Sequence, residues 1–257
     1  MKRIAFFDLD YTLIPYDTLL LFTNFILQKF RWRTAYLLYL PVLLPLALLS
    51  ILNSGQLKRR FLCYLWGLQR ENLEKLSESF VEQEVLHRLY PEVVAELEAL
   101  RQAGYVTVLN TASPEFYVRY IARALKFDYC FATQFAIPDT LGFHQTLKLP
   151  NNKHLQKLRS LPDELLPPGL KEILGQPFDY DLLHANCHPG SVSYTDSAAD
   201  LPLLAMAQDG VLIHPSRSLA EKGKGKWKVL HPGRPYKGRV GRAVRSVLMA
   251  CGVFYGR

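Results

Sequence analysis

The fold class of this chain is decided by the stretch Ile4-Ala5-Phe6-Phe7-Asp8-Leu9-Asp10-Tyr11-Thr12-Leu13. Its short apolar run, residues 4–7, predicts a buried strand. Asp8 and Asp10 follow two residues apart, so both carboxylates leave the strand end on the same side. Ligands of open α/β sheets bind at the carboxyl ends of the strands. Burying two acids there is costly unless a cation or a reaction uses them, although such pairs also serve as ordinary turn and cap residues.

Further predicted strands and helices alternate along the rest of the chain. Strands are predicted at 105–110, 128–133, 191–195 and 211–213, and helices at 91–102, 115–125, 152–160 and 199–207. Residues 135–149 predict a hairpin flap, and the proline-rich segment 161–190 an irregular insertion. The alternation predicts an α/β fold with a doubly wound, parallel, Rossmann-like sheet.

Polar residues follow the later strands as well. Thr111 and Ser113 come after the second strand, Lys153 lies further on, and Asp196 and Asp200 close the series. In this order the set resembles the four motifs of the haloacid dehalogenase superfamily of phosphatases. The resemblance is to the phosphoserine-phosphatase-like branch, in which a helical cap is inserted after strand 1. It covers roughly residues 2–230 and departs from the family at position 195, where threonine replaces the usual glycine.

The resemblance implies a reaction and a cofactor. Asp8 would be the nucleophile and form a phospho-aspartyl intermediate, while Asp10 would protonate the leaving oxygen and then activate water. Mg²⁺ is implied, because a dianionic phosphate needs its charge neutralised and an all-oxygen site suits this ion. Its ligands would be Asp8, the backbone carbonyl of Asp10 and Asp196, with Asp200 behind them or bound through water.

Four more residues receive roles by the same resemblance. Thr111 would hydrogen-bond a phosphoryl oxygen, Ser113 would lie at the substrate, and Thr12 would brace the catalytic loop. Lys153 would pair with both the phosphoryl group and the nucleophile. Lys148 and Lys157 are the alternatives to Lys153.

The implied organisation is a catalytic core of residues 1–14 and 89–230, a cap of residues 15–88 and a basic tail of residues 231–257. Within the cap, residues 34–57 carry no charged side chain, a length and apolarity typical of a membrane segment. One crossing would separate the first motif from the other three, so both ends must lie on the same side. Basic residues flank both ends, which indicates the cytoplasmic side. We therefore expect an interfacial or re-entrant cap, the alternative being helices buried against the protein or in a dimer.

The positive charge of the chain is concentrated near its end. From residue 217 onward there are eleven Lys and Arg against one acid, whereas the whole chain carries +8. Arg239, Arg242 and Arg245 recur every three residues, and valines fall largely on another face if the stretch is helical. Such a helix suits an anionic membrane surface. Nucleic acid is a less favoured partner, because few aromatics accompany the basic residues, and a disordered tail is the remaining alternative.

An apolar cap and a basic tail together indicate a phosphorylated lipid as substrate, at the cytoplasmic face of the membrane. The pattern is similar to the phosphatidylglycerophosphatase C group, whose cap also carries an apolar run followed by a basic patch and a Leu-Trp-Gly step, here residues 65–67. Arg59 and Arg60 could hold the bridging phosphodiester, or only anchor the cap. Asp17 could accept hydrogen bonds from the substrate, or cap the helix that follows it.

The sequence thus predicts a Mg²⁺-dependent phosphatase with phosphatidylglycerophosphate as first candidate substrate. One alternative is a soluble phosphatase that acts on phosphoserine or a similar small monoester. The other is a non-catalytic membrane adaptor, which would have no need to retain the acids and the lysine.

Overall fold

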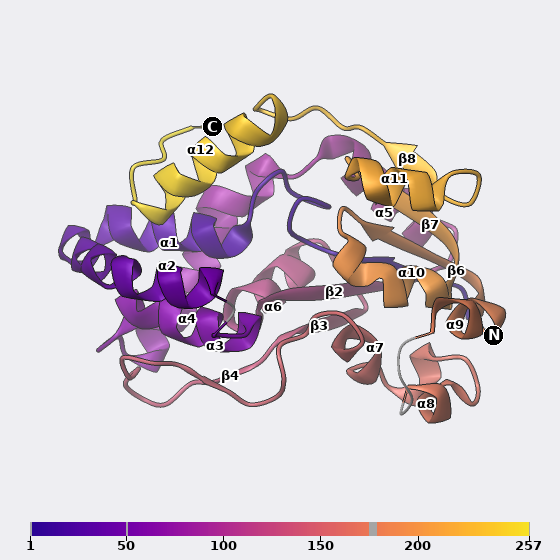
Figure 1. Ribbon diagram of the computed structural model, residues 1–257, viewed down its shortest axis with the longest axis horizontal. Coiled ribbons are helices and arrows are strands. Elements are labelled where there is room, and N and C mark those ends of the chain that lie inside the picture. The colour runs from indigo at the N-terminus through magenta and orange to yellow at the C-terminus, as the bar shows by residue number, and fades with distance from the viewer. Residues whose placement is uncertain (1, 50, 175–178, 257) are drawn as a thin grey trace.

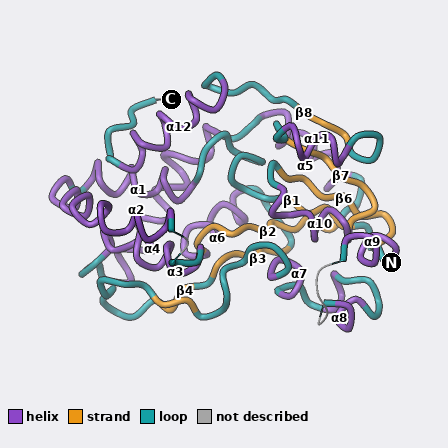
Figure 2. Tube along the Cα trace, viewed as in Figure 1, coloured by secondary structure: helices purple, strands orange, loops and turns teal. Residues whose placement is uncertain are grey.

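A six-stranded parallel sheet forms the centre of the structure, a computed structural model that describes residues 2–49, 51–174 and 179–256 (Figure 1). The strands, orange in Figure 2, have the order β3-β2-β1-β6-β7-β8. Their bounds are β1 Ile4–Phe7, β2 Val106–Pro114, β3 Tyr129–Thr133, β6 His188–Thr195, β7 Ala207–Ile213 and β8 Lys228–Leu230. The predicted doubly wound α/β sheet is confirmed, with β8 as an edge strand beyond the predicted set.

The position of β1 brings the ends of three strands together. It pairs in parallel with β2 on one side and β6 on the other, so Phe7 lies between Leu109 and Tyr194. The strand order reverses here, which makes this edge the topological switch point where open α/β sheets bind ligands. Asp8, Thr111 and Asp196 follow at this edge.

Side chains of β1 alternate between two hydrophobic clusters, as the pleat of a strand requires. Ala5 and Phe7 pack in the larger cluster, and Ile4 and Phe6 in the smaller. Helices with residues in the larger cluster include α5 Pro91–Gln102 and α6 Glu115–Ala124; those in the smaller include α7 Gln156–Arg159, α8 Leu170–Ile173, α9 Tyr180–Ala185 and α10 Leu201–Met206. Because β1 is buried on both faces, all four of its residues are apolar, which explains the uninterrupted apolar run in the sequence.

The proline-rich segment 161–190 has a structural role. Apart from residues 175–178, which lie outside the described residues, it forms a short 3₁₀ turn, α8 and α9. Leu161, Leu165 and Leu170 are buried in the smaller cluster together with Ile4 and Phe6. The described parts of the segment thus pack against one face of the sheet as short helical turns between prolines.

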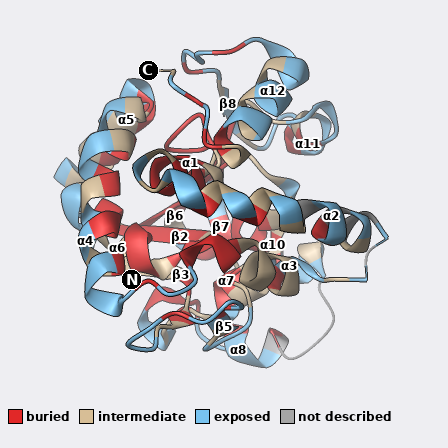
Figure 3. Cartoon of the chain, turned by 90° about the vertical axis from the view of Figure 1, so that its left-hand side faces the viewer, coloured by how far each residue is buried: buried red, intermediate tan, exposed pale blue. Residues whose placement is uncertain are grey.

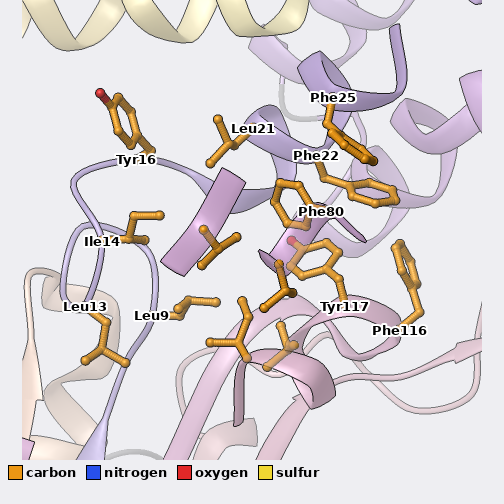
Figure 4. Packing of buried hydrophobic residues seen from close by; sticks show 14 of the residues in the cluster. Leu9, Leu13, Ile14, Tyr16, Leu21, Phe22, Phe25, Phe80, Phe116 and Tyr117 are labelled. Atoms are coloured by element: carbon orange, nitrogen blue, oxygen red, sulfur yellow. The ribbon is translucent and has the colours of Figure 1, made fainter. Parts of the chain in front are cut away.

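Helices between β1 and α5 form the region predicted as the cap. They are α1 Thr18–Lys29, α2 Leu40–Leu48, α3 Ser54–Phe61 and α4 Arg70–Phe80, with 3₁₀ turns at Arg31–Tyr39, Leu62–Leu65 and Leu86–Arg88 and a π-turn at Val81–Val85. Aromatic rings join them to the core: the Phe22 centroid lies 5.1 Å from that of Phe80 and 5.3 Å from that of Tyr117 (Figure 4). Throughout the described residues, every helix is too short or too polar to cross a bilayer.

Two smaller elements complete the fold. Strands β4 Phe135–Ala136 and β5 Thr146–Leu147 pair antiparallel, which confirms the predicted flap. After α11 Arg217–Gly223 and β8, helix α12 Gly238–Ala250 packs against α1 and lies above it in Figure 1. Figure 3 shows the contrast between the buried sheet and the largely exposed α2 and α12. Residues 238–250 of the predicted tail are thus an ordered helix.

Candidate active site

The catalytic loop turns sharply after β1. The amide of Asp8 donates to the Tyr194 carbonyl at 3.0 Å, and the amides of Leu13 and Ile14 both donate to the Leu9 carbonyl, at 2.9 and 3.3 Å. Tyr11 adopts a left-handed backbone with φ +58°, which is uncommon for a non-glycine residue and frequent at functional sites. This turn keeps Asp8 and Asp10 at the switch point of the sheet.

A small cavity of about 160 Å³ opens at this loop. Four of the predicted acids and one of the two predicted threonines line it. The lining includes Asp8, Asp10, Thr111, Lys153, Lys157, Asp196, Asp200 and Arg242. Residues far apart in the sequence therefore meet in one hollow, as the four-motif pattern requires.

Lys157 is the lysine that contacts the proposed nucleophile. Its Nζ lies 3.0 Å from Asp8 Oδ1 and 2.7 Å from Asp200 Oδ2, and its side chain is 2% exposed. Burial disfavours the charged lysine, but Asp200 and Asp8 outweigh this and raise its pKa. The prediction that Lys153 pairs with Asp8 is wrong, because Lys157 makes this contact. Lys153 lines the same cavity.

The two asparagines before Lys153 explain the error. Asn152 is buried, and its Nδ2 donates to Asn110 Oδ1 at 2.9 Å and to the Thr111 carbonyl at 3.0 Å. Asn152 therefore anchors the chain to β2, and Lys157 follows in the single turn of α7. Leu158 comes directly after Lys157 and is buried. Its apolar side chain is the signal in the sequence that could have indicated that this turn packs against the core.

Asp200 and Thr195 support the lysine from behind. The Thr195 hydroxyl donates to Asp200 Oδ2 at 2.8 Å, the same oxygen that Lys157 approaches. Threonine at the position where the family usually has glycine thus supplies one more hydrogen bond to this buried acid. Asp200 is occupied by these contacts, in keeping with the predicted place behind the metal.

Asp10 points its carboxylate toward the cap helix α1. Its Oδ1 accepts from the Thr18 amide at 2.9 Å and the Thr18 hydroxyl at 2.6 Å, and its Oδ2 accepts from the Ser113 hydroxyl at 2.6 Å. Burial, followed by the charge of Asp17, raises the pKa of Asp10 to about 6. Ser113, predicted at the substrate, instead holds Asp10. A carboxyl with this pKa can donate and accept a proton near neutral pH.

Asp196 and Asp8 form the part of the site that fits a divalent cation. Burial, and then the charge of Asp8, raises the pKa of Asp196 to about 8; burial also raises that of Asp8 to about 7 despite Lys157. The Nη1 atom of Arg242 lies 3.9 Å from Asp196 Oδ2, and its positive charge offsets the negative charge of Asp196 only weakly. A buried surplus of negative charge on hard oxygen atoms matches Mg²⁺.

The number of side-chain ligands also suits this ion. Across the described residues no three His, Cys, Asp or Glu side chains gather as a metal-binding group. Asp10 commits its carboxylate to Thr18 and Ser113, which leaves its backbone carbonyl as the predicted donor. Mg²⁺ commonly keeps several waters and takes one or two protein carboxylates, so Asp8 and Asp196 with one carbonyl suffice.

The two predicted threonines lie at the site with different environments. Thr111 is buried at the cavity wall, and its Oγ1 accepts from the Ser113 amide at 3.2 Å, which leaves its proton free to donate. Thr12 is fully buried, and its hydroxyl has no hydrogen-bond partner among the described residues. Thr12 therefore supports the loop through its backbone amide, which donates to the Leu9 carbonyl at 3.2 Å.

The cap contributes a lysine that the sequence analysis did not assign. Lys58 Nζ donates to the Ala112 carbonyl and to Asn151 Oδ1, the latter at 2.9 Å, and so joins α3 to the end of β2. Burial lowers the pKa of Lys58 to about 8, although Asp10 and Asp17 act in the opposite direction. Of Lys58, Arg59 and Arg60, Lys58 is the residue whose contact, Ala112, lines the catalytic cavity.

Arg59 and Arg60 lie away from the catalytic cavity. Arg59 Nε donates to the Gln145 carbonyl of the flap at 2.8 Å, and Arg60 Nη1 reaches the Gln56 carbonyl at 3.5 Å. Neither lines the catalytic cavity, so their predicted contact with a phosphodiester has no support here. Asp17 caps α1, since its Oδ1 accepts from the Leu20 amide at 3.1 Å. That contact matches the capping alternative for Asp17.

Arg242 of α12 is the other unassigned cation at the site. Its guanidinium lies 3.3 Å from the centroid of the Tyr11 ring and faces Asp196. Arg245 donates to the Pro235 carbonyl at 2.6 Å, while Val240, Val244 and Val247 are exposed. Two of the three predicted membrane-facing arginines therefore turn toward the protein, and α12 presents valines outward.

Comparisons with known proteins agree with this geometry. A model of the haloacid dehalogenase-like hydrolase family matches residues 5–205. A search of curated proteins found no match. Among solved structures, a protein with unknown function from Bordetella pertussis Tohama I is 22% identical, with a TM-score of 0.70 over 90% of this chain and 99% of that one.

Two solved structures of phosphoserine phosphatase are also similar. One, a phospho-aspartyl intermediate analogue, is 18% identical with a TM-score of 0.52, over 90% of this chain and 94% of that one. The other, a substrate-bound complex, is 18% identical with a TM-score of 0.52, over 89% and 93%. At such identities the similarity establishes a shared fold.

Proposed function

This chain belongs to the haloacid dehalogenase-like hydrolase family, as the sequence predicted, and on that premise we propose that it is a Mg²⁺-dependent phosphomonoesterase acting on a phosphorylated lipid. The observation that carries the proposal is the buried ion-pair network Asp8–Lys157–Asp200 in one cavity with Asp196. A non-catalytic adaptor would have no use for so costly an arrangement of buried charge.

The contacts support a two-step reaction. Asp8 attacks phosphorus, a bond forms between its oxygen and the phosphorus atom, and the bond to the leaving oxygen breaks while Asp10 gives that oxygen a proton. Water then attacks the phospho-aspartyl group, Asp10 takes the proton of the water, and the bond to Asp8 breaks. Lys157 holds Asp8 in position, and Thr111 can donate to a phosphoryl oxygen.

Magnesium would supply positive charge between the buried carboxylates and the phosphoryl oxygens. Asp8, Asp196 and the Asp10 carbonyl would hold it. Lys157 and Asp200 already satisfy each other, so they would orient the site rather than bind the ion.

The lipid part of the proposal rests on the exposed apolar surface of the cap. Leu38, Val42, Leu49 and Ile51 are 83%, 54%, 70% and 60% exposed. Leu38 also lines an apolar hollow of about 360 Å³, together with Trp32, Tyr39, Trp66 and Phe143. Exposed apolar side chains gathered in one segment are typical of a membrane or protein contact. We infer that the cap lies in the cytoplasmic leaflet, with phosphatidylglycerophosphate as first candidate substrate.

A phosphate-release screen tests the activity. Wild-type protein is incubated with phosphatidylglycerophosphate, phosphatidate and phosphoserine, each with Mg²⁺ or with a chelator. Release from the two lipids that stops on chelation supports the proposal. Preferential release from phosphoserine would favour the soluble alternative, which the similar phosphoserine phosphatase structures also suggest. Absence of release from all three would count against a phosphomonoesterase.

Vesicle sedimentation tests the membrane contact separately. The triple variant Leu38→Ser, Val42→Ser and Leu49→Ser should bind vesicles of phosphatidylglycerol and phosphatidylcholine about 100-fold more weakly, since each apolar side chain contributes about 1 kcal/mol.

The matched control is a triple serine variant at Leu149, Leu182 and Val229, which are exposed elsewhere at 51%, 36% and 40%. Equal losses in the two variants would reject the cap as the membrane contact.

A further inference from the structure

A second cavity lies directly beside the catalytic one. Its volume is about 410 Å³, and it shares Asp196, Ser197 and Arg242 with the catalytic cavity. Three residues thus line both hollows, which places the two cavities side by side.

Arginines dominate the lining of this second cavity. Arg217 begins α11, Arg234 precedes α12, and Arg239 and Arg242 lie on α12. The acid among its lining residues is Asp196, which the proposed function assigns to the metal. Among the described residues, Arg217, Arg234 and Arg239 form no salt bridge. Their charge is therefore available to a ligand.

We propose that this cavity is a subsite for a second phosphate of the substrate, a proposal that rests on the function above. Guanidinium groups bind phosphate oxygens through paired hydrogen bonds, and several of them converge here. The phosphomonoester would lie at Asp8 while a phosphodiester, joined to it by a short bridge, lies against Arg234 and Arg239. Arg242, between the two cavities, would contact both groups.

This assignment transfers a predicted role from the cap to the C-terminal helix. Arg59 and Arg60 were candidates either to hold the phosphodiester or to anchor the cap, and they contact the flap and their own helix. Among the arginines of the second cavity, Arg242 also lines the catalytic cavity. Selection between a lipid with one phosphate and a lipid with two would thus depend on α12 and the segment before it.

Selectivity between two soluble short-chain lipids tests the subsite. Dihexanoyl phosphatidylglycerophosphate carries a monoester and a diester, and dihexanoyl phosphatidate carries a monoester alone; both are used as monomers so that no membrane surface is present. The double variant Arg234→Gln/Arg239→Gln should lower the ratio of their kcat/KM values roughly 10- to 100-fold. An equal loss of kcat/KM for both lipids would overturn the subsite and indicate that the arginines attract anions in general.

A matched double variant controls for the loss of two positive charges. Lys222 and Lys224 are exposed near the end of α11 and do not line either cavity. Lys222→Gln/Lys224→Gln should keep the ratio within about twofold of wild type, as is usual for exposed charges. A fall as large as that of the arginine variant would overturn the proposal.

A binding measurement separates this inference from the proposed activity. In the Asp8→Asn protein, calorimetry compares glycerol bisphosphate with glycerol phosphate. Tighter binding of the bisphosphate that disappears when Arg234 and Arg239 are replaced supports the subsite, even if neither lipid is hydrolysed. Equal binding of the two compounds would overturn it. Wild-type hydrolysis of glycerol bisphosphate as fast as of the lipid would support the subsite with a soluble bisphosphate as its ligand.

Discussion

Replacing Lys157 by methionine removes the cation that two buried carboxylates share. The lysine is 2% exposed and lies 3.0 Å from Asp8 and 2.7 Å from Asp200. Removal of one partner from a buried ion pair costs about 3–5 kcal/mol, because the remaining charge has no compensation. For a chain of this size that corresponds to a fall in Tm of roughly 10 °C. Methionine keeps much of the volume, so the loss reports mainly on charge.

The pH dependence of that loss distinguishes charge from packing. Burial already raises the pKa of Asp8 from 3.8 to about 7, and loss of Lys157 raises it further. A carboxyl with a raised folded-state pKa favours the folded state below its unfolded pKa, and that contribution is lost as the pH rises through the folded pKa. The destabilisation relative to wild type should therefore be smaller at pH 5, where Asp8 is neutral and only the contact with Asp200 is lost, and largest above pH 8.

Urea unfolding followed by circular dichroism, with metal chelated, measures this effect. Lys153→Met is the control, since Lys153 is half-buried in the same cavity and forms no salt bridge within the described residues. It should change the free energy of unfolding by less than about 0.5 kcal/mol. A larger loss in the Lys153 variant, or a loss in the Lys157 variant that does not vary with pH, would refute the assignment.

Three further outcomes are expected. Asp8→Asn should keep the fold by circular dichroism and lower kcat at least about 1,000-fold, because the nucleophile is lost; residual activity well above that level would point to another nucleophile. Ser113→Ala removes a hydrogen bond that stabilises ionised Asp10, so the pKa of Asp10 should rise from about 6. The alkaline limb of the kcat/KM profile should then move up by about one pH unit, and an unmoved limb would exclude Asp10 as the acid. Asp196→Asn should weaken Mg²⁺ binding in calorimetry about tenfold or more, and unchanged affinity would remove Asp196 from the metal site.

Sequence reasoning located the sheet and its acids because these depend on local signals. A four-residue apolar run followed by Asp8 and Asp10 specifies a strand and what lies at its end. The same holds for Thr111 near the carboxyl end of β2 and for Asp196 after β6. Parallel pairing brings such ends together without further information.

The cations of the site depend on tertiary packing and were harder to predict. Lys157 rather than Lys153 reaches Asp8 because Asn152 anchors the preceding loop to β2. Consecutive residues of a helix point about 100° apart, so of Lys58, Arg59 and Arg60 one alone could face the site. Nothing in the local pattern selected the first of the three.

Arg242 was missed for a different reason. Its sequence neighbourhood, with arginines at every third position, has the pattern of a helix that meets an anionic surface. The inward direction of Arg242 follows from the contact of α12 with α1 and from the half-buried ring of Tyr11, whose backbone is left-handed. Both are properties of the folded chain.

The attachment of α12 has a consequence for how the enzyme is made in the cell. Asn24 in α1 holds the backbone of Phe254 through two hydrogen bonds of 3.0 Å, so the segment that carries Arg242 is fastened to a helix near the start of the chain. Arg242 leaves the ribosome after every other residue that lines the catalytic cavity. Until α12 has been made, the strands β1, β2 and β6 can pair, but the catalytic cavity still lacks the positive charge of Arg242. Arg242 can therefore complete the lining of the catalytic cavity only after α12 has been made and has docked onto α1.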